Sequence, residues 1–267
     1  MKRFIPAALA VAGLLATSFS WAADTPEEFK SQGFITIGVK AESKPWGFLD
    51  PSGKNIGMDI DLGNDIARRL GVPAKFVSVT SSTRIPFLEQ GKIDMIIATM
   101  YDTEARRKVV RMVEPHYGSA GTALLAPKQN PFKSWADIRD KTLCGVNGSN
   151  YNKPAQQEGA KVIAFSGLSE TLAALKAGNC SAVIYGDLEL AIQLNDPAWS
   201  GYTMPLESRD ELPWSIGVRK GDKSDALYKF LSDTVKDWHK TGYLMEVNKK
   251  WGLQPTRFLM QMHDKYK

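Results

Sequence analysis

Apolar and polar positions along the chain follow two recurring patterns. Short, nearly continuous apolar runs, such as Ile35–Val39 and 93–98, predict strands of a parallel sheet with both faces covered. Between such runs, apolar residues at helical spacing predict helices, as over 62–70, where Gly71 provides the stop signal. Alternation of strands and helices with short connections is typical of an α/β unit.

The same pattern restarts near residue 142, which predicts a second α/β unit. Extended apolar stretches at 118–125 and 214–218 flank this unit, and a helical tail is expected over 224–251. Two units joined by two extended crossings suggest a hinged pair that binds ligand in the cleft between them. The other expected strands are at 75–80, Thr142–Val146, Lys161–Phe165 and 181–185. The other expected helices are at 84–90, 168–177 and 188–194. The helix at 62–70 is expected to be capped by Asp59 or Asp61.

The first 22 residues have the pattern of an export signal. Lys2 and Arg3 form a basic head, residues 4–19 are apolar and uncharged, and Ser20 and Ala22 are small residues at the −3 and −1 positions of a cleavage site. The apolar run is short for a membrane span, although an anchor that is not cleaved is the alternative. We therefore expect the mature protein in the periplasm, with residues 1–22 removed.

Composition and charge narrow the class of protein. A chain of 267 residues with 43% hydrophobic and 24% charged residues is not mainly disordered. Its 34 basic and 29 acidic residues give a net charge of +5, and loss of Lys2 and Arg3 leaves 32 against 29, or +3. A charge this weak and scattered does not favour nucleic-acid binding.

The cysteines and histidines carry separate predictions. Cys144 and Cys180 form a single pair in an exported chain, so we expect a disulfide that closes a loop of about 36 residues, with two buried free thiols as the alternative. The histidines show no metal-ligand spacing, and no phosphate-binding loop or nucleophile elbow occurs. We expect no metal, no cofactor and no catalysis.

Polar loops at the strand ends supply the candidate binding groups. Thr103 can cap a helix that begins at Glu104, which places Arg106 at the positive helix end, where it can hold a carboxylate. Ser149 precedes a second helix and offers another anion site, and Asp187 ends a strand where it can hold an ammonium group. The alternative for Arg106 is a surface ion pair, that for Ser149 is an ordinary turn, and that for Asp187 is a helix N-cap. Together the groups fit a zwitterionic amino acid.

A series of short motifs resembles the periplasmic solute-binding proteins of ABC importers, in the family for polar amino acids (family 3). The resemblance runs from about residue 35 to 253 and implies a two-lobe, type II α/β fold hinged by two crossover strands. It implies a first lobe of residues 23–120 and 216–267, a second lobe of 121–215, and a membrane permease as partner. The motifs are Gly38-Val39 with Pro45-Trp46-Gly47-Phe48, Gly57-Met58-Asp59-Ile60-Asp61-Leu62, Arg84-Ile85-Pro86-Phe87-Leu88, Gly91-Lys92-Ile93-Asp94, Ala98-Thr99-Met100 followed by Thr103, Glu104 and Arg106, Glu114-Pro115, and Ala182-Val183 leading to Asp187.

The resemblance also implies roles for single residues. Arg106 would bind the ligand carboxylate together with Thr99 and Ser149, and Asp187 would bind its amino group. A residue of the loop at 40–46 would pack on the ligand, with Ser43 and Trp46 as candidates. One departure is Tyr101, at a position where the family usually has Thr or Ser.

Charged and aromatic residues near the expected cleft bear on which amino acid is bound. Arg84, a second cation opposite Arg106, would fit an acidic side chain, and Lys40 and Lys44 add positive charge near the cleft mouth. Glu42 favours a neutral or cationic side chain instead. Trp46 and Tyr101 would either wall an aromatic ligand or pack in the core. We expect a monomer that binds an acidic or polar amino acid.

Two other functions fit the same resemblance. The first is a secreted enzyme similar to cyclohexadienyl dehydratases, for which Glu42, Glu170 or Glu189 could act as general acid, although no spacing favours one of them. The second is a sensor module, which usually comes fused to a membrane helix.

Overall fold

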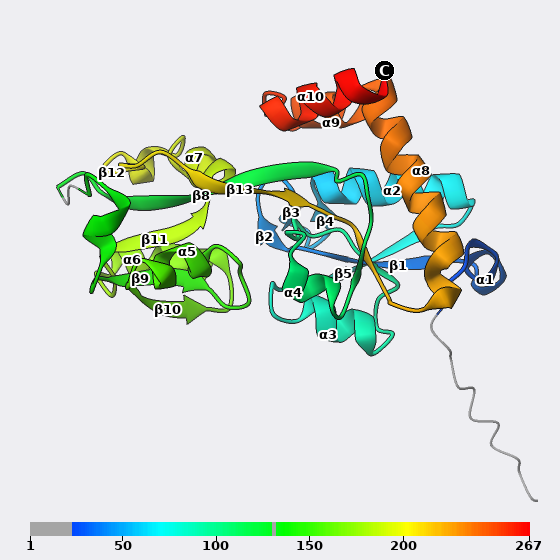
Figure 1. Cartoon of the computed structure of the whole chain (residues 1–267), viewed down its shortest axis with the longest axis horizontal. Helices are drawn as coiled ribbons and strands as arrows, with labels where there is room; N and C mark the ends of the chain where they lie inside the picture. Colours follow the sequence, from blue (N-terminus) through cyan, green and yellow to red (C-terminus); the bar gives the residue numbers. More distant parts are fainter. Residues whose placement is uncertain (1–22, 130–131) are drawn as a thin grey trace, which may run out of the picture.

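Two α/β lobes joined by extended strands make up the structure, a computed structural model that describes residues 23–129 and 132–267 (Figure 1). The two-lobe α/β architecture expected from the sequence is confirmed. The export signal expected at 1–22 lies outside the described residues. Within the described part, no helix has both the length and the apolar character needed to cross a membrane.

The first lobe is built on a five-stranded sheet that takes strands from distant parts of the chain. In spatial order these are β5 (Ala74–Ser78), β1 (Ile35–Val39), β6 (Met95–Ile96), β14 (Gly217–Val218) and β7 (Arg111–Met112). β1 is parallel to β5 and β6, whereas β14 is antiparallel to β6 and β7. The lobe also contains α1 (Pro26–Gln32), α2 (Met58–Leu70), α3 (Arg84–Glu89), α4 (Glu104–Arg107) and a small sheet of β2 (Glu42–Ser43), β3 (Gly47–Leu49) and β4 (Asn55–Ile56).

The second lobe has its own sheet and its own covering helices. Its strands in spatial order are β10 (Lys161–Phe165), β9 (Thr142–Val146), β11 (Ala182–Gly186), β8 (Gly118–Pro127) and β12 (Tyr202–Thr203), and β13 (Arg209–Trp214) also pairs with β8. The helices are α5 (Asn152–Gln157), α6 (Leu168–Lys176) and α7 (Asp187–Gln193), with short 3₁₀ turns η1 (Trp135–Ile138) and η2 (Pro197–Trp199). β9, β10 and β11 are parallel, so their carboxyl ends lie at one edge of the sheet.

The connection between the lobes is a pair of antiparallel strands. Gly118 and Ser119 of β8 pair with Trp214 and Pro213 of β13, and the two strands run side by side between the lobes in Figure 1. The N–H of Tyr117 donates to the carbonyl of Trp214 at 3.1 Å, which extends the pairing into the first lobe. The expected crossing at 118–125 is thus part of β8, whereas the one expected at 214–218 is divided between the end of β13 and β14.

Three helices at the carboxyl end pack against the first lobe. They are α8 (Asp225–Thr241), preceded by the 3₁₀ turn η3 (Asp222–Ser224), then α9 (Tyr243–Lys250) and α10 (Arg257–Tyr266). Trp238 of α8 donates its indole N–H to Asp65 of α2 at 2.7 Å. The helical tail expected over 224–251 is confirmed, and Gly242, with a φ of 79°, divides it into α8 and α9. α10 was not predicted.

Two expectations about local structure are wrong. The cap of α2 is Gly57 rather than Asp59 or Asp61, and no side chain caps this helix. Gly57 has a φ of 132°, and a Cβ there would lie 2.4 Å from the carbonyl oxygen of Trp46. The strand expected over 93–98 is limited to β6, because β1 and β14 pair only with its two residues.

The expected disulfide between Cys144 and Cys180 is confirmed, with the two Cα atoms 5.7 Å apart. Cys144 lies in β9, and Cys180 lies just before β11, the strand that pairs with β9. Both residues are buried. The bond therefore closes the segment that contains α5, β10 and α6 within the second lobe.

Removal of this disulfide should destabilise the protein without changing the fold. For Cys144→Ala/Cys180→Ala we expect the free energy of unfolding to fall by about 3–4 kcal/mol, because a closed loop of about 36 residues restricts the unfolded chain. Urea unfolding followed by circular dichroism measures the change, and reduction of the wild type should reproduce it. Two reactive thiols in unreduced, denatured wild type would contradict the disulfide.

Candidate functional site

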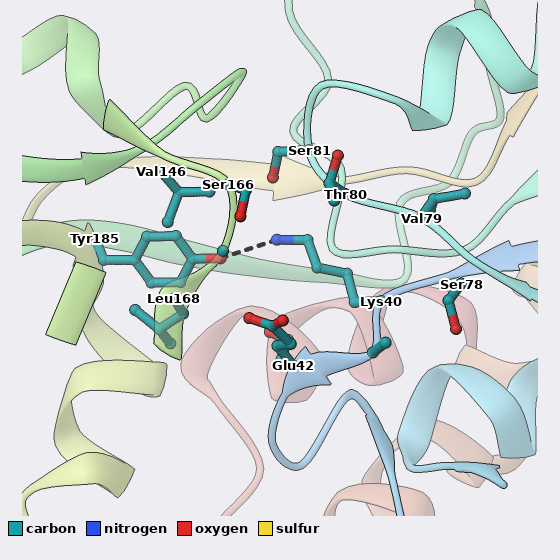
Figure 2. A pocket seen from close by; sticks show the side chains of 13 residues that line it. Lys40, Glu42, Ser78, Val79, Thr80, Ser81, Val146, Ser166, Leu168 and Tyr185 are labelled. Carbon is teal, nitrogen blue, oxygen red and sulfur yellow. Dashed lines mark hydrogen bonds between the residues drawn. The ribbon is translucent and has the colours of Figure 1, made fainter. Parts of the chain in front are cut away.

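Loops at the strand ends of both lobes surround a cavity of about 240 Å³ (Figure 2). Parallel strands collect their carboxyl ends at one edge of a sheet, which is where α/β proteins bind ligands. Here the edges of two sheets face each other. The lining consists of Lys40, Ala41, Glu42, Ser43, Ser78, Val79, Thr80 and Ser81 from the first lobe and Val146, Ser166, Gly167, Leu168 and Tyr185 from the second.

Lys40 reaches across this cavity from the end of β1. Its Nζ donates to the hydroxyl of Tyr185 at 2.8 Å, the contact drawn in Figure 2, and the residue is only 8% exposed. Burial lowers the pKa of Lys40 to about 7, and the nearby Arg84 lowers it further. The carboxylates of Glu189 and Asp59 oppose this shift. The sequence places Lys40 near the cleft mouth, but the structure buries it between the lobes.

Glu189 brings a buried carboxylate to the same region from α7. The residue is 3% exposed, and its Oε1 accepts a hydrogen bond from Ser43 across the cleft at 3.4 Å. Its Oε2 has no hydrogen-bond partner among the residues that the structure describes. Burial raises the pKa of Glu189 to about 7, although Lys40 opposes the rise. A buried acceptor without a hydrogen-bond partner is energetically costly, so a ligand that donates a hydrogen bond to this oxygen would be stabilised here.

Arg84 and Asp59 extend the buried charges into the first lobe. Arg84 is 2% exposed and donates through Nη1 to the carbonyl of Ala98 at 2.6 Å. Burial, followed by repulsion from Arg106, lowers the pKa of Arg84 to about 9. Asp59 is fully buried, and this burial raises its pKa to about 8. Arg84 therefore repels the ammonium group of Lys40, and Asp59 attracts it.

Arg106 bridges the lobes on another side of the cleft. Thr103 caps α4, as expected, and accepts from the N–H of Arg106 at 3.3 Å. The guanidinium donates to the carbonyl of Tyr101 at 2.9 Å and to that of Gly148, in the second lobe, at 3.2 Å. Burial lowers the pKa of Arg106. The side chain is half-buried and is not part of the cavity lining.

Thr99 and Tyr101 lie beneath the cleft in the loop after β6. Thr99 has a φ of 45°, unusual for a β-branched residue, and its N–H donates to the hydroxyl of Tyr117 at 2.9 Å. Strained backbone of this kind clusters at functional sites. Tyr101 is buried, donates to the carbonyl of Ala120 at 2.5 Å, and its ring centroid lies 4.9 Å from that of Tyr151 in the second lobe.

Trp46, Ser149 and Ser43 have different surroundings. Trp46 is buried and packs edge-on against Trp214 at 5.6 Å between ring centroids, away from the cavity lining. Ser149 is half-buried, and its N–H donates to the carbonyl of Val146. Of the eight side chains expected at the site, only Ser43 lines the cavity itself.

Asp187 points toward the hinge. Its Oδ1 accepts from the N–H of Gly121 on β8 at 3.1 Å and from that of Leu188 at 2.8 Å. Burial raises the pKa of Asp187, and a hydrogen bond from Ser208 opposes the rise. The residue begins α7, and Gly186 is the N-cap residue, so Asp187 is not the N-cap. The carboxylate that reaches across the cleft is that of Glu189.

Sequence reasoning named Glu189 only as one of three acids for an enzyme. The available signal was helical spacing: residues two apart on a helix do not face the same way, so Asp187 and Glu189 cannot both point to the same side. Tyr151 and Tyr185 were missed entirely, because an aromatic residue in an apolar strand or loop has the pattern of core packing.

One cluster of potential metal ligands lies outside the cleft. Asp102, Glu114 and His116 come together, although the sequence shows no ligand spacing among the histidines. The guanidinium of Arg107 pairs with both carboxylates, and His116 is 2.7 Å from Asp102. The cluster is thus an ion-pair network with its own cation.

Comparison with known proteins agrees with this geometry. The ABC transporter glutamine-binding protein GlnH of Bacillus subtilis is 32% identical over 235 residues, which cover 85% of this chain and 84% of that protein. Among solved structures, a mutant of ArgBP from T. maritima has a TM-score of 0.78 and 30% identity, covering 85% of this chain and 98% of that one.

A third relative bears on the enzyme alternative. The ancestral amino acid-binding protein AncCDT-1, described as a precursor of cyclohexadienyl dehydratase, has a TM-score of 0.74 and 27% identity, covering 85% of this chain and 98% of that one. These neighbours share the type II periplasmic binding protein fold. A sequence profile of the bacterial extracellular solute-binding proteins, family 3, matches residues 35–254. The chain belongs to this family of bacterial extracellular solute-binding proteins.

Proposed function

We propose that this protein captures an amino acid between its lobes and delivers it to the membrane permease of an ABC transporter. The observation that carries the proposal is the cavity whose lining comes from both lobes, at the strand ends of two separate sheets. The name of the Bacillus subtilis relative, a glutamine-binding protein of an ABC transporter, supports the ligand class and the partner.

The ligand carboxylate would bind Arg106. An arginine has five N–H donors, and the hydrogen bonds to Tyr101 and Gly148 use only two of them. The remaining donors suit the two oxygens of a carboxylate. Thr99, Tyr101 and Ser149 are proposed as its neighbours, and a carboxylate of α7, the helix that carries Asp187 and Glu189, would bind the ammonium group.

The cations near the cleft favour an acidic or polar amino acid. Lys40 lines the cavity, and Arg84 lies buried beneath it. Serine and threonine hydroxyls make up much of the remaining wall, which suits a polar side chain better than an aromatic one. Trp46 supports this preference, because it packs on Trp214 instead of the cavity.

Binding would be coupled to closure of the lobes. Contacts from Lys40 to Tyr185, from Ser43 to Glu189 and from Arg106 to Gly148 join residues of the first lobe to residues of the second. A ligand that touches both halves stabilises the closed arrangement over the open one. The permease would recognise this closed shape. We expect the mature protein to act as a monomer in the periplasm.

Replacement of Arg106 tests the carboxylate site. Arg106→Ala should weaken binding of the preferred amino acid about a hundredfold or more, because the carboxylate of the bound ligand loses its charged partner. Isothermal titration calorimetry against the twenty amino acids identifies the ligand and measures the loss. The matched control is Arg107→Ala, an exposed neighbour whose partners are Asp102 and Glu114. No binding of any amino acid to the wild type rejects the proposed function, and full binding by Arg106→Ala rejects the site.

A substitution at Gly148 tests closure. A Cβ at this position would lie 2.8 Å from the backbone of Ser82 in the opposite lobe, so Gly148→Ala should weaken ligand binding about tenfold. Gly178→Ala is the control, since its φ of 76° is close to the 72° of Gly148 but a Cβ there has open space. Calorimetry gives the affinities, and small-angle X-ray scattering with ligand reports the compactness. Equal affinities of the two variants would show that the lobes do not close in this way.

A dehydratase-like enzyme is a second candidate. It draws on the likeness to AncCDT-1 and on the buried Glu189, whose pKa of about 7 suits a general acid at neutral pH. Absorbance after addition of prephenate or arogenate tests it. Turnover that is lost in Glu189→Gln supports the enzyme, and no turnover rejects it.

A further inference from the structure

The cavity wall around Lys40 is rich in hydrogen-bond donors. Lys40 supplies an ammonium group, and one of its three donors is used by Tyr185. The only carboxylate in the lining is that of Glu42, which is exposed. An ammonium group among hydroxyls is the environment that an anionic group requires. The hydroxyls in the same lining belong to Ser43, Ser78, Thr80, Ser81, Ser166 and Tyr185.

The charges that act on Lys40 also favour an anion in its vicinity. Arg84 and Arg106 repel its ammonium group, whereas Glu189 and Asp59 attract it. Lys40, Arg84 and Arg106 are therefore three cations close to one another near the cleft, and the carboxylate of an acidic side chain would give them an additional anionic partner.

The ammonium group of such a ligand needs a carboxylate that is still available. Asp187 is engaged by the N–H groups of Gly121 and Leu188. Glu189 keeps a buried oxygen, Oε2, without a partner among the described residues. A Cβ at Gly186 would lie 2.3 Å from this oxygen, so the carboxylate occupies the space above the end of β11.

We infer that Lys40 and Glu189 determine ligand specificity, and that the ligand is an acidic amino acid. Lys40 binds the anionic group of its side chain, and Glu189 binds its ammonium group. This inference rests on the proposed function and narrows it. Because the two residues come from different lobes, only the closed form presents both of them to one ligand.

The comparison of L-glutamate with L-glutamine tests Lys40, since the two ligands have the same shape and differ in charge. The wild type should bind L-glutamate or L-aspartate about tenfold to a hundredfold more tightly than its amide. Lys40→Met should lose about a hundredfold in affinity for the acid and less than about threefold for the amide. Calorimetry measures all the affinities.

Two further variants separate charge from folding. Lys40→Arg keeps the positive charge and should keep the preference for the acid over the amide. Lys44→Met removes an exposed lysine of the same loop, which lies over the ring of Phe48, and should leave the preference unchanged. A preference that survives in Lys40→Met, or that is lost equally in Lys44→Met, overturns the role of Lys40.

Glutarate, which is L-glutamate without its amino group, tests Glu189. Glu189→Gln should weaken L-glutamate about a hundredfold and change glutarate less than about threefold, because only the amino acid has the ammonium group. Glu158→Gln, whose carboxylate pairs with Arg209 outside the cavity lining, is the matched control and should bind both ligands as the wild type does. Asp187→Asn tests the other carboxylate of α7. The opposite result, with the loss in Asp187→Asn alone, overturns the assignment of Glu189.

The outcomes distinguish this inference from the function on which it rests. Binding of none of the twenty amino acids rejects the proposed function. Tightest binding of a neutral or basic amino acid leaves that function in place and rejects the inference of an acidic ligand.

Discussion

The burial of charged side chains between two lobes is the constraint on which the rest of the structure depends. In the proposed closure of the lobes, Lys40, Glu189 and Arg106 would lose hydration, which is costly unless each charge has a partner. Lys40 finds Tyr185, and Arg106 finds the carbonyls of Tyr101 and Gly148. A ligand that supplies missing partners would therefore favour the proposed closure by compensating these charges.

Aromatic rings give this polar region a fixed frame. The rings of Tyr101, Tyr151 and Tyr185 follow each other with centroids 4.9 Å apart at each step, from the first lobe into the second. Tyr101 is tied to the hinge strand through the carbonyl of Ala120. The first pair is edge-to-face and the second is tilted, and because packed rings have preferred geometries this row restricts how the lobes can meet.

Local patterns predicted most of the scaffold and only part of the site. β1, β9 and β10 have the bounds that the sequence predicts. β1 and β9 are buried parallel strands with few polar positions, whereas β10 is a more exposed edge strand with a largely apolar sequence. β13 was missed, since its charged and proline-containing sequence forms a strand only by pairing with β8. Glu189 was named only as one of three possible general acids of an enzyme and not as a ligand-binding residue, because an acid on a short helix has the pattern of a solvent-exposed residue and only the packing of two lobes buries it.

The position of β14 in the first sheet has a consequence for the order of assembly. β14 lies between β6 and β7, yet it follows the whole second lobe in the sequence. All strands of the second lobe are therefore synthesised before the last strand of the first sheet exists. The first lobe therefore cannot complete its sheet until the whole inserted lobe has been synthesised, so the two ends of the first lobe's sequence must come together around the insertion.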